Sequence, residues 1–134
     1  MIKKCFFCHL SGSKKDKLIL EDDDFFSIYD AAPVSPGHAI VVPKVHIVSF
    51  FEVEPEFIRK MYGFIVKVKR KIDEEYHPDA YNLGINDGRA AGRSADHLHV
   101  HLIPRYIGDV ANPRGGIRNL MGRDIPPERV PDNF

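Results

Sequence analysis

The alternation of apolar and polar positions predicts short strands on both sides of one long helix. Runs rich in β-branched and aromatic residues, bounded by turn-forming residues, are typical of strands. They lie at 17–20, 25–29, 38–43, 80–85 and 98–103. The acidic residues 21–24 between the first two strands predict a solvated turn, with a cation site as the alternative.

A helix is predicted from Pro55 to the residue before His77. Proline is tolerated at the first helical position, and His77-Pro78 ends the pattern. Apolar residues between them recur at spacings of three and four, which predicts one stripe facing the core. The basic run 67–71 is expected to be a solvated face rather than a nucleic-acid patch. The stripe consists of Ile58, Met61, Tyr62, Ile65, Val68, Ile72 and Tyr76.

The order of these elements indicates the fold class. Strands followed by one helix and then by further strands predict an α+β fold, with an antiparallel sheet of about five strands and one long helix. The length of 134 residues suits a single domain, 1–134. From about residue 106 the chain is rich in Pro, Gly and Arg without periodicity, so we expect an irregular C-terminal tail.

Composition and charge exclude several classes of protein. Lys+Arg and Asp+Glu both number 19, so the formal net charge is zero and no excess of positive charge exists to hold long nucleic acid. The apolar runs are shorter than a membrane span, and the apolar stretch at the N-terminus is too short for a signal-peptide core. A cytoplasmic protein with no long nucleic acid or membrane as partner is expected.

Three of the seven histidines alternate with apolar residues in the segment HLHVHLIP. Because alternate side chains of a strand point to opposite faces, His97, His99 and His101 share one face. A polar strand with incidental histidines is the simplest interpretation. Two chemical ones remain. The three imidazoles can hold a catalytic Zn²⁺ with an open position. Alternatively, one imidazole is a nucleophile beside another that serves acid–base chemistry.

Cys5 and Cys8 form a C-x-x-C pair near the N-terminus. They supply only half of a tetrahedral zinc site, and the chain has no other cysteine, so histidines would have to complete it. A redox pair of this spacing is expected at the start of a helix, and the Ser-Gly-Ser turn that follows argues against one. Two simple core thiols are the third possibility.

The segment His97–Ile103 matches the signature H-φ-H-φ-H-φ-φ, φ being apolar, and resembles the histidine triad (HIT) family of nucleotide hydrolases and transferases. Two further stretches are similar to the family: 30–46, with Pro-Gly-His and Pro-Lys-x-His elements, and 86–94. The resemblance therefore covers nearly the whole chain. It implies a homodimer paired through the helix and a strand. It also implies an adenine or guanine nucleotide conjugate as substrate, cleaved at its α-phosphate with release of a nucleoside monophosphate.

The resemblance implies catalytic roles for two histidines of the triad. His99 would attack the α-phosphate and carry a covalent nucleotidyl group, with its Nδ1 proton donated to a nearby backbone carbonyl. His101 would bind the phosphate and the leaving group. His38 matches a fourth family histidine, which supports the triad from a neighbouring strand.

Contacts to the nucleotide are implied by the same resemblance. Asp30 matches an acidic residue that accepts hydrogen bonds from the ribose hydroxyls. Asn86 and Ser94 match polar residues that contact phosphate oxygens, where negative charge must be stabilised. An apolar base pocket, for which core packing is the alternative, would consist of Phe7, Leu10 and Phe26.

A structural zinc site is implied as well. In one branch of the family a similar C-x-x-C joins the histidine of the Pro-Lys-x-His element and the first triad histidine on one Zn²⁺. By position these ligands are Cys5, Cys8, His46 and His97. Since protein would fill all four places, the metal would be structural and would attach the N-terminus to the strand that carries the nucleophile.

Arg93 departs from the family pattern, in which Gly-Gln usually precedes the Ser or Thr. A guanidinium suits phosphate oxygens and favours a highly charged leaving group; the alternative is a side chain in solvent. Arginines in and just before the C-terminal tail can bind the distal phosphates of a polyphosphate substrate. The alternatives are a solvated tail or a contact between subunits. Together these features favour a dinucleoside polyphosphate over a nucleoside phosphoramidate. The tail arginines are Arg105, Arg114, Arg118 and Arg123.

Two other functions stay open beside this one. A zinc hydrolase would use all three triad histidines as ligands, so that a chelator would abolish the chemistry itself. A nucleotide-binding regulatory protein would bind nucleotide and release no nucleoside monophosphate.

Overall fold

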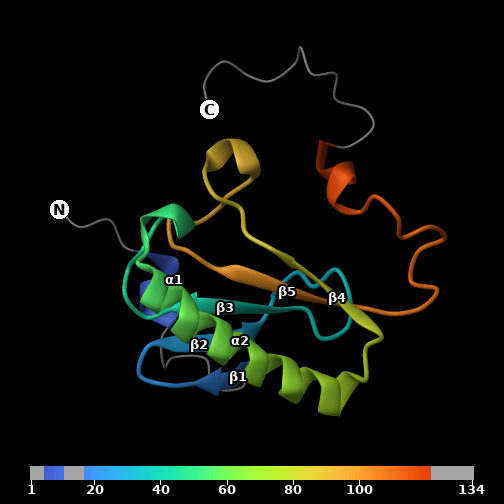
Figure 1. Cartoon of the computed structure of the whole chain (residues 1–134), viewed down its shortest axis with the longest axis horizontal. Coiled ribbons are helices and arrows are strands. Elements are labelled where there is room, and N and C mark those ends of the chain that lie inside the picture. Colours follow the sequence, from blue (N-terminus) through green and yellow to red (C-terminus); the bar gives the residue numbers. More distant parts are fainter. Residues whose placement is uncertain (1–4, 11–16, 122–134) are drawn as a thin grey trace.

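A five-stranded antiparallel sheet forms the centre of the computed structural model, which describes residues 5–10 and 17–121 (Figure 1). The strand order is β1-β2-β3-β5-β4, so β1 and β4 are its edges. The α+β fold with about five antiparallel strands and one long helix is thereby confirmed. The strands are β1 (Leu18–Glu21), β2 (Phe25–Tyr29), β3 (Ala39–Pro43), β4 (Ala80–Gly84) and β5 (Val100–Arg105).

The long helix α2, Pro55–Tyr76, crosses one face of the sheet (Figure 1). It begins at Pro55 as predicted, and His77 ends it in the left-handed conformation with φ 52°. The predicted stripe is wrong at Tyr62, which is 68% exposed, whereas Phe64 is buried. One residue is a turn of about 100° in a helix, so Tyr62 lies to the side of the buried line. That line consists of Met61, Phe64, Val68 and Ile72.

The two faces of the sheet pack against different partners. Strand alternation sends Ala39 and Val41 of β3 into the core beneath α2, and Ile40 and Val42 into a second core on the opposite face. Phe7 belongs to that second core. The side of the sheet away from α2 is therefore also covered, by the N-terminal segment.

A short helix α1, Phe6–Leu10, forms this cover (Figure 1). The sequence analysis did not predict it, because five residues are too few to show a helical period. Cys5 precedes the helix and Cys8 lies within it. The pair therefore does lie at the start of a helix, but this helix precedes an antiparallel sheet and is not part of a βαβ unit, which a redox pair of this spacing is expected to have.

The remaining boundaries differ slightly from the prediction. The acidic turn 21–24 is exposed, as expected of a solvated turn. β5 begins at Val100, so His97 and His99 precede the strand, although Leu98 already donates its N–H to the carbonyl of Ile47 at 2.6 Å. The described part of the chain has three short 3₁₀ helices, at Phe50–Glu52, Arg89–Ala91 and Ile117–Met121. Within 5–10 and 17–121, no helix is long and apolar enough to cross a membrane.

Candidate functional site

The triad histidines lie on the side of the sheet away from α2. β5 pairs with β3, with Ile40 opposite His101, so both residues share that face. The intervening residues Leu98, Val100 and Leu102 are buried in the core beneath α2, as the alternation predicts. The three imidazoles consequently form a row between the sheet and the N-terminal segment.

His97 is fully buried and its two ring nitrogens have different partners. Nε2 lies 2.7 Å from the carbonyl oxygen of Pro43. A carbonyl only accepts hydrogen bonds, so Nε2 carries the proton and donates it. Nδ1 therefore keeps its lone pair, and it lies 3.2 Å from the Sγ of Cys5 and 3.2 Å from the Nδ1 of His46.

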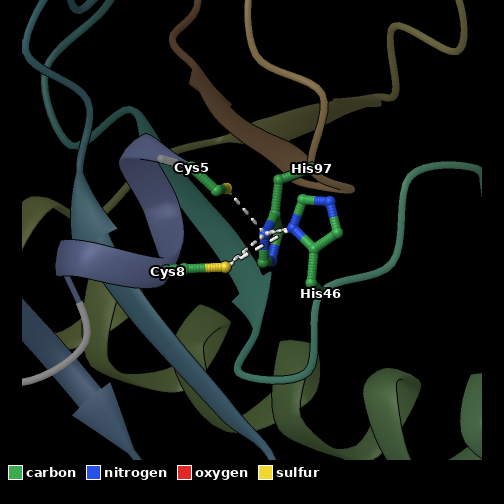
Figure 2. A group of neighbouring side chains, drawn as sticks. All are labelled: Cys5, Cys8, His46 and His97. Atoms are coloured by element: carbon green, nitrogen blue, oxygen red, sulfur yellow. Dashed lines mark hydrogen bonds between the residues drawn. The ribbon is translucent and has the colours of Figure 1, made fainter. Parts of the chain in front are cut away.

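Figure 2 shows four such donor atoms pointing toward one another. The Sγ atoms of Cys5 and Cys8 and the Nδ1 atoms of His46 and His97 all lie within 4.8 Å of one another. Cys8 Sγ is 3.4 Å from His46 Nδ1 and 3.6 Å from His97 Nδ1. Bonds of about 2.1 Å from nitrogen and 2.3 Å from sulfur, at tetrahedral angles, give ligand separations of about 3.3–3.8 Å. The four residues thus fit a tetrahedral zinc ion.

The ring of His99 is oriented by a backbone carbonyl. Nδ1 donates to the carbonyl oxygen of His97 at 2.8 Å, so the lone pair lies on Nε2. The ring of Phe7 packs against the His99 imidazole, with ring centroids 4.8 Å apart. An imidazole held in this tautomer offers Nε2 as a nucleophile.

His101 has the opposite tautomer, set by a chain of two hydrogen bonds. The N–H of Val34 donates to His38 Nδ1 at 3.1 Å, so the proton of a neutral His38 is on Nε2. That nitrogen is 2.9 Å from His101 Nδ1 and donates to it. His101 consequently carries its own proton on Nε2. Asp30 Oδ2 lies beside this pair, 3.5 Å from His38 and 3.6 Å from His101.

Burial favours the neutral forms that this chain requires. It lowers the pKa of His101, and the neighbouring His99 and His38 lower it further, while Asp30 acts in the opposite direction. Burial also lowers the pKa of His38, again opposed by Asp30. Neutral His101 is therefore a hydrogen-bond donor at Nε2 in neutral solution.

A pocket of about 300 Å³ opens onto His99 and His101. Asp30, Asn86 and Ser94 line it, as the sequence analysis expected of residues that contact a nucleotide. Three other polar or aromatic residues of the lining were not predicted, because no sequence pattern distinguishes them from ordinary surface or core positions. These are Phe6, Lys17 and Tyr29.

The three residues predicted for the base pocket have different surroundings. Phe7 lines the pocket and also packs in the second core. Phe26, 1% exposed, lies in that core and is not among the pocket-lining residues, so core packing is the correct interpretation. The side chain of Leu10 lies outside the described residues.

Arg93 is held within the loop that precedes the triad. Its guanidinium lies 3.1 Å from Asp96 Oδ1, and its side chain is only 13% exposed, so the alternative of a residue pointing into solvent is wrong. Its buried Nε has no hydrogen-bond partner among the described residues. Arg93 is not one of the residues that line the pocket as the structure stands.

The arginines of the C-terminal region differ in what the structure shows of them. Arg105 is bound to Asp109 at 2.7 and 2.9 Å and to Asn82 at 2.7 Å, so its guanidinium already has partners. It holds the pKa of Asp109 well below the usual range. Arg114 and Arg118 are exposed, and Arg123 lies outside the described residues.

The three triad histidines do not converge on one point. Among the described residues, two groups bring three or more metal-binding atoms together: the Cys5 cluster, and Asp30 with His38 and His101. Neither contains all three histidines of the triad, because the free ring nitrogen of His97 faces the cysteines whereas His99 and His101 line the pocket. A zinc hydrolase with the triad as its ligands is not supported by this geometry.

A row of histidines on a small antiparallel sheet, with a pocket at its end, defines a class of protein. The HIT domain family model matches residues 11–108, and the chain belongs to the HIT family. It is 33% identical over 105 residues to "Protein hit" of Bacillus subtilis (strain 168), covering 78% of this chain and 72% of that protein.

Two further relatives bear on the site. The crystal structure of a Zn-bound histidine triad family protein from Mycobacterium smegmatis matches with a TM-score of 0.70 at 34% identity, covering 87% of this chain and 89% of the other. Adenylylsulfatase HINT3 of Arabidopsis thaliana is 33% identical over 102 residues, which are 75% of this chain and 52% of that protein.

Proposed function

We propose that the protein hydrolyses nucleotide conjugates at the α-phosphate, through a covalent nucleotidyl group on His99, and releases a nucleoside monophosphate. The observation that carries this proposal is the hydrogen bond from His99 Nδ1 to the carbonyl of His97. It leaves the lone pair on Nε2, beside a pocket whose combination of polar and aromatic lining residues suits a nucleotide. The adenylylsulfatase relative supports a substrate with an adenylyl group.

The chemical step follows from the two opposite tautomers. Nε2 of His99 attacks the α-phosphorus, a P–N bond forms, and the bond to the leaving group breaks. The N–H of His101 Nε2 donates to a phosphate oxygen throughout; a phosphate-chain leaving group departs as an anion, and an amine takes a proton from solvent. Water then attacks the same phosphorus and releases a proton to solvent, the P–N bond breaks, and the nucleoside monophosphate leaves with the neutral His99 imidazole restored.

The pocket residues bind and orient the substrate in this proposal. Asp30 accepts hydrogen bonds from the ribose hydroxyls. Asn86 and Ser94 donate to the phosphate oxygens, which gain negative charge as the pentavalent transition state forms. Phe6 and Phe7 supply apolar contact to an adenine or guanine base. His38 supports the site by holding the tautomer of His101.

We also propose that one structural Zn²⁺ is held by Cys5, Cys8, His46 and His97. The buried lone pair of His97 Nδ1 is the observation that favours it, since a metal ion satisfies this lone pair where two thiols and another imidazole surround it. When bound, the ion offers no open position for substrate and supplies a rigid link between α1 and the triad. Thiolate ligands of this kind persist in a reducing compartment, which agrees with a cytoplasmic protein.

The leaving group is the finer part of the proposal. Arg93 adds a fixed positive charge next to Ser94, a residue of the pocket wall. If a substrate draws the guanidinium away from exposed Asp96, the charge stabilises a departing phosphate chain more than a departing amine, which needs a proton instead. We therefore favour dinucleoside polyphosphates, with nucleoside phosphoramidates next.

A homodimer is proposed from the surface beside α2. An apolar groove of about 310 Å³ lies between α2 and the edge strand β4. Tyr62 is 68% exposed and Leu83 50% exposed at this groove, and an edge strand has unpaired backbone groups. A second copy covers both. Tyr62→Glu should convert a dimer to a monomer in light scattering.

Mass spectrometry after brief incubation with diadenosine tetraphosphate tests the mechanism. The expected result is an adenylyl group on the peptide that contains His99, and AMP as a product. Tight binding with no AMP would support the regulatory alternative. Turnover without an adduct in the wild type, but lost on chelation of a protein that remains folded, would support a metal-based hydrolase.

A further inference from the structure

The loop 86–94 carries two polar residues of the pocket wall, one at each end. Asn86 and Ser94 both line the pocket, and the chain between them turns through a 3₁₀ helix at Arg89–Ala91. Gly88, with φ 96°, begins the turn, and its carbonyl accepts the N–H of Arg93 at 3.2 Å. The two ends of the loop are therefore joined to each other by a backbone hydrogen bond.

Asp87, next to Asn86, fastens this loop to another segment of the chain. Its carboxylate accepts the N–H of Phe50 at 2.7 Å and the hydroxyl of Ser49 at 3.0 and 3.1 Å. The Ser49 oxygen in turn accepts the N–H of Phe51 at 3.1 Å. The carboxylate thus binds the first turn of the 3₁₀ helix at Phe50–Glu52, where free N–H groups favour an anion.

The segment that receives Asp87 is itself fixed to the triad. His46 belongs to the proposed zinc cluster, and the next residue, Ile47, accepts the N–H of Leu98 at 2.6 Å. Leu98 lies between His97 and His99 in the chain. A path of short contacts therefore leads from the nucleophile strand through 47–50 to Asp87 and on to Asn86.

We infer that Asp87 is a positioning residue, which holds the Asn86 amide at the distance from His99 that the phosphate group requires. This inference rests on the proposed function. Asp87 does not line the pocket, so it acts through Asn86 rather than on the substrate. Displacement of a donor by about 1 Å is enough to cost on the order of a hundredfold in rate, so one lost anchor has a measurable effect.

Asp87→Ala removes the acceptor for both the Phe50 N–H and the Ser49 hydroxyl. We expect kcat to fall about tenfold on diadenosine tetraphosphate while zinc content stays at its wild-type value. Asp87→Asn is the conservative variant. Its amide oxygen can accept from Phe50 and its NH₂ can donate to Ser49, so it should restore kcat to within about threefold of wild type.

Asp22, which does not line the pocket, offers a matched control. Its carboxylate also accepts hydrogen bonds from two groups, here the backbone N–H groups of Asp24 and Phe25, both at 2.8 Å, in the turn between β1 and β2. Asp22→Ala should lower the melting temperature about as much as Asp87→Ala and leave kcat within about twofold of wild type. An equal loss of kcat in both variants would overturn the inference, because general destabilisation would then explain it.

A double-mutant cycle separates positioning from a merely structural role. In an Asn86→Ala background, Asp87→Ala should lower kcat by less than about twofold, since the group that it positions is gone. A full tenfold loss in that background would overturn the inference. If Asn86→Ala alone leaves kcat unchanged, the phosphate contact of the proposed function fails, and the role of Asp87 fails with it. If Asn86→Ala lowers kcat and the effects of the two substitutions are additive, the proposed phosphate contact stands and only the positioning role of Asp87 is refuted.

Discussion

The two ends of the histidine row contain the same tautomer of the same side chain, with the proton on Nε2, but present opposite ring nitrogens to their surroundings. At one end, His97 donates from Nε2 to the carbonyl of Pro43, so its Nδ1 lone pair faces two cysteines. At the other end, His101 accepts at Nδ1 from His38, so its Nε2–H faces the pocket. The first is suited to a metal and the second to a phosphate. The comparison teaches that the partner of one ring nitrogen decides the chemistry of the other.

His99 lies between His97 and His101 and is in contact with both. It donates from Nδ1 to the carbonyl of His97, so His97 contributes its ring to the cluster with Cys5, Cys8 and His46 and orients the His99 ring through its backbone. Phe7 of α1 packs against both rings, with centroids 5.7 Å from His97 and 4.8 Å from His99. The ring of Phe7 and the backbone of His97 therefore connect the cysteine–histidine cluster directly to His99.

Replacement of the central histidine should have the largest effect. His99→Ala removes the nucleophile and is expected to lower kcat by at least ~10⁴-fold, with the fold and nucleotide binding retained. His101→Gln, which removes one donor to the phosphate, should cost roughly a hundred- to thousandfold. Steady-state release of AMP measures both. Wild-type turnover in His99→Ala would refute the mechanism.

Replacement of the proposed zinc ligands around His97 should change the melting temperature more than it changes the rate of the chemical step. We expect about one Zn²⁺ per chain by elemental analysis of protein purified without added metal. Cys5→Ser should lower zinc content and melting temperature, because a ligand that binds only the folded state at a free concentration a thousand times its Kd stabilises it by about 4 kcal/mol. Its effect on the chemical step should be smaller and indirect. Full zinc content in the Cys5→Ser, Cys8→Ser double variant contradicts the assignment.

A smaller effect is expected from Arg93, which distinguishes between leaving groups. The wild type should have a higher kcat/KM for diadenosine tetraphosphate than for adenosine 5′-phosphoramidate. Arg93→Gln should narrow that ratio about tenfold, or roughly 1.4 kcal/mol of transition-state binding. Asp96→Asn, which frees the guanidinium from its ion pair, serves as the control and should not narrow the ratio. If the ratio of the two kcat/KM values is unchanged in Arg93→Gln, the arginine does not contribute to the choice of leaving group.

The smallest expected effect is the pH dependence of the free energy of unfolding that His38 and His101 cause. Because burial lowers the pKa of His38 and His101 in the folded protein, the unfolded chain binds more protons below about pH 6.5. The free energy of unfolding should therefore fall as the pH is lowered from 7.5 to 5.5. Urea unfolding of the Cys5→Ser, Cys8→Ser variant measures this without a metal contribution. His38→Gln should make the slope shallower, and an unchanged slope would exclude His38 as a cause.

Much of the fold was predictable because its signals are local. The five strands and the helix from Pro55 carry their period in their own residues, and the observed boundaries differ from the predicted ones by at most two residues. The helical spacing failed to separate the residues of α2 that face the core from those that face the groove beside β4. Tyr62 recurs at helical spacing, yet it lines that groove and is exposed. α1 was missed because a five-residue helix has no period to detect.

The candidate site was predictable to a similar degree. Family motifs placed His99, Asp30 and Ser94 in the pocket, but gave no means to separate Phe26, a core residue, from Phe7, which lines it. Both are aromatic residues near the N-terminus. Only the packing of α1 on the sheet distinguishes them, and this depends on contacts distant in the chain.

The sequence by itself determined which histidines share a face, because alternation in a strand is a property of the backbone at each residue. The tertiary structure decided what each imidazole can do. Tautomers depend on partners that lie far away in the chain: Pro43 is 54 residues from His97, Cys5 is 92 residues from it, and His38 is 63 residues from His101. The family motifs indicated which of these residues meet, but the position of each proton follows only from the hydrogen bonds that form when the sheet, α1 and the loops have packed together.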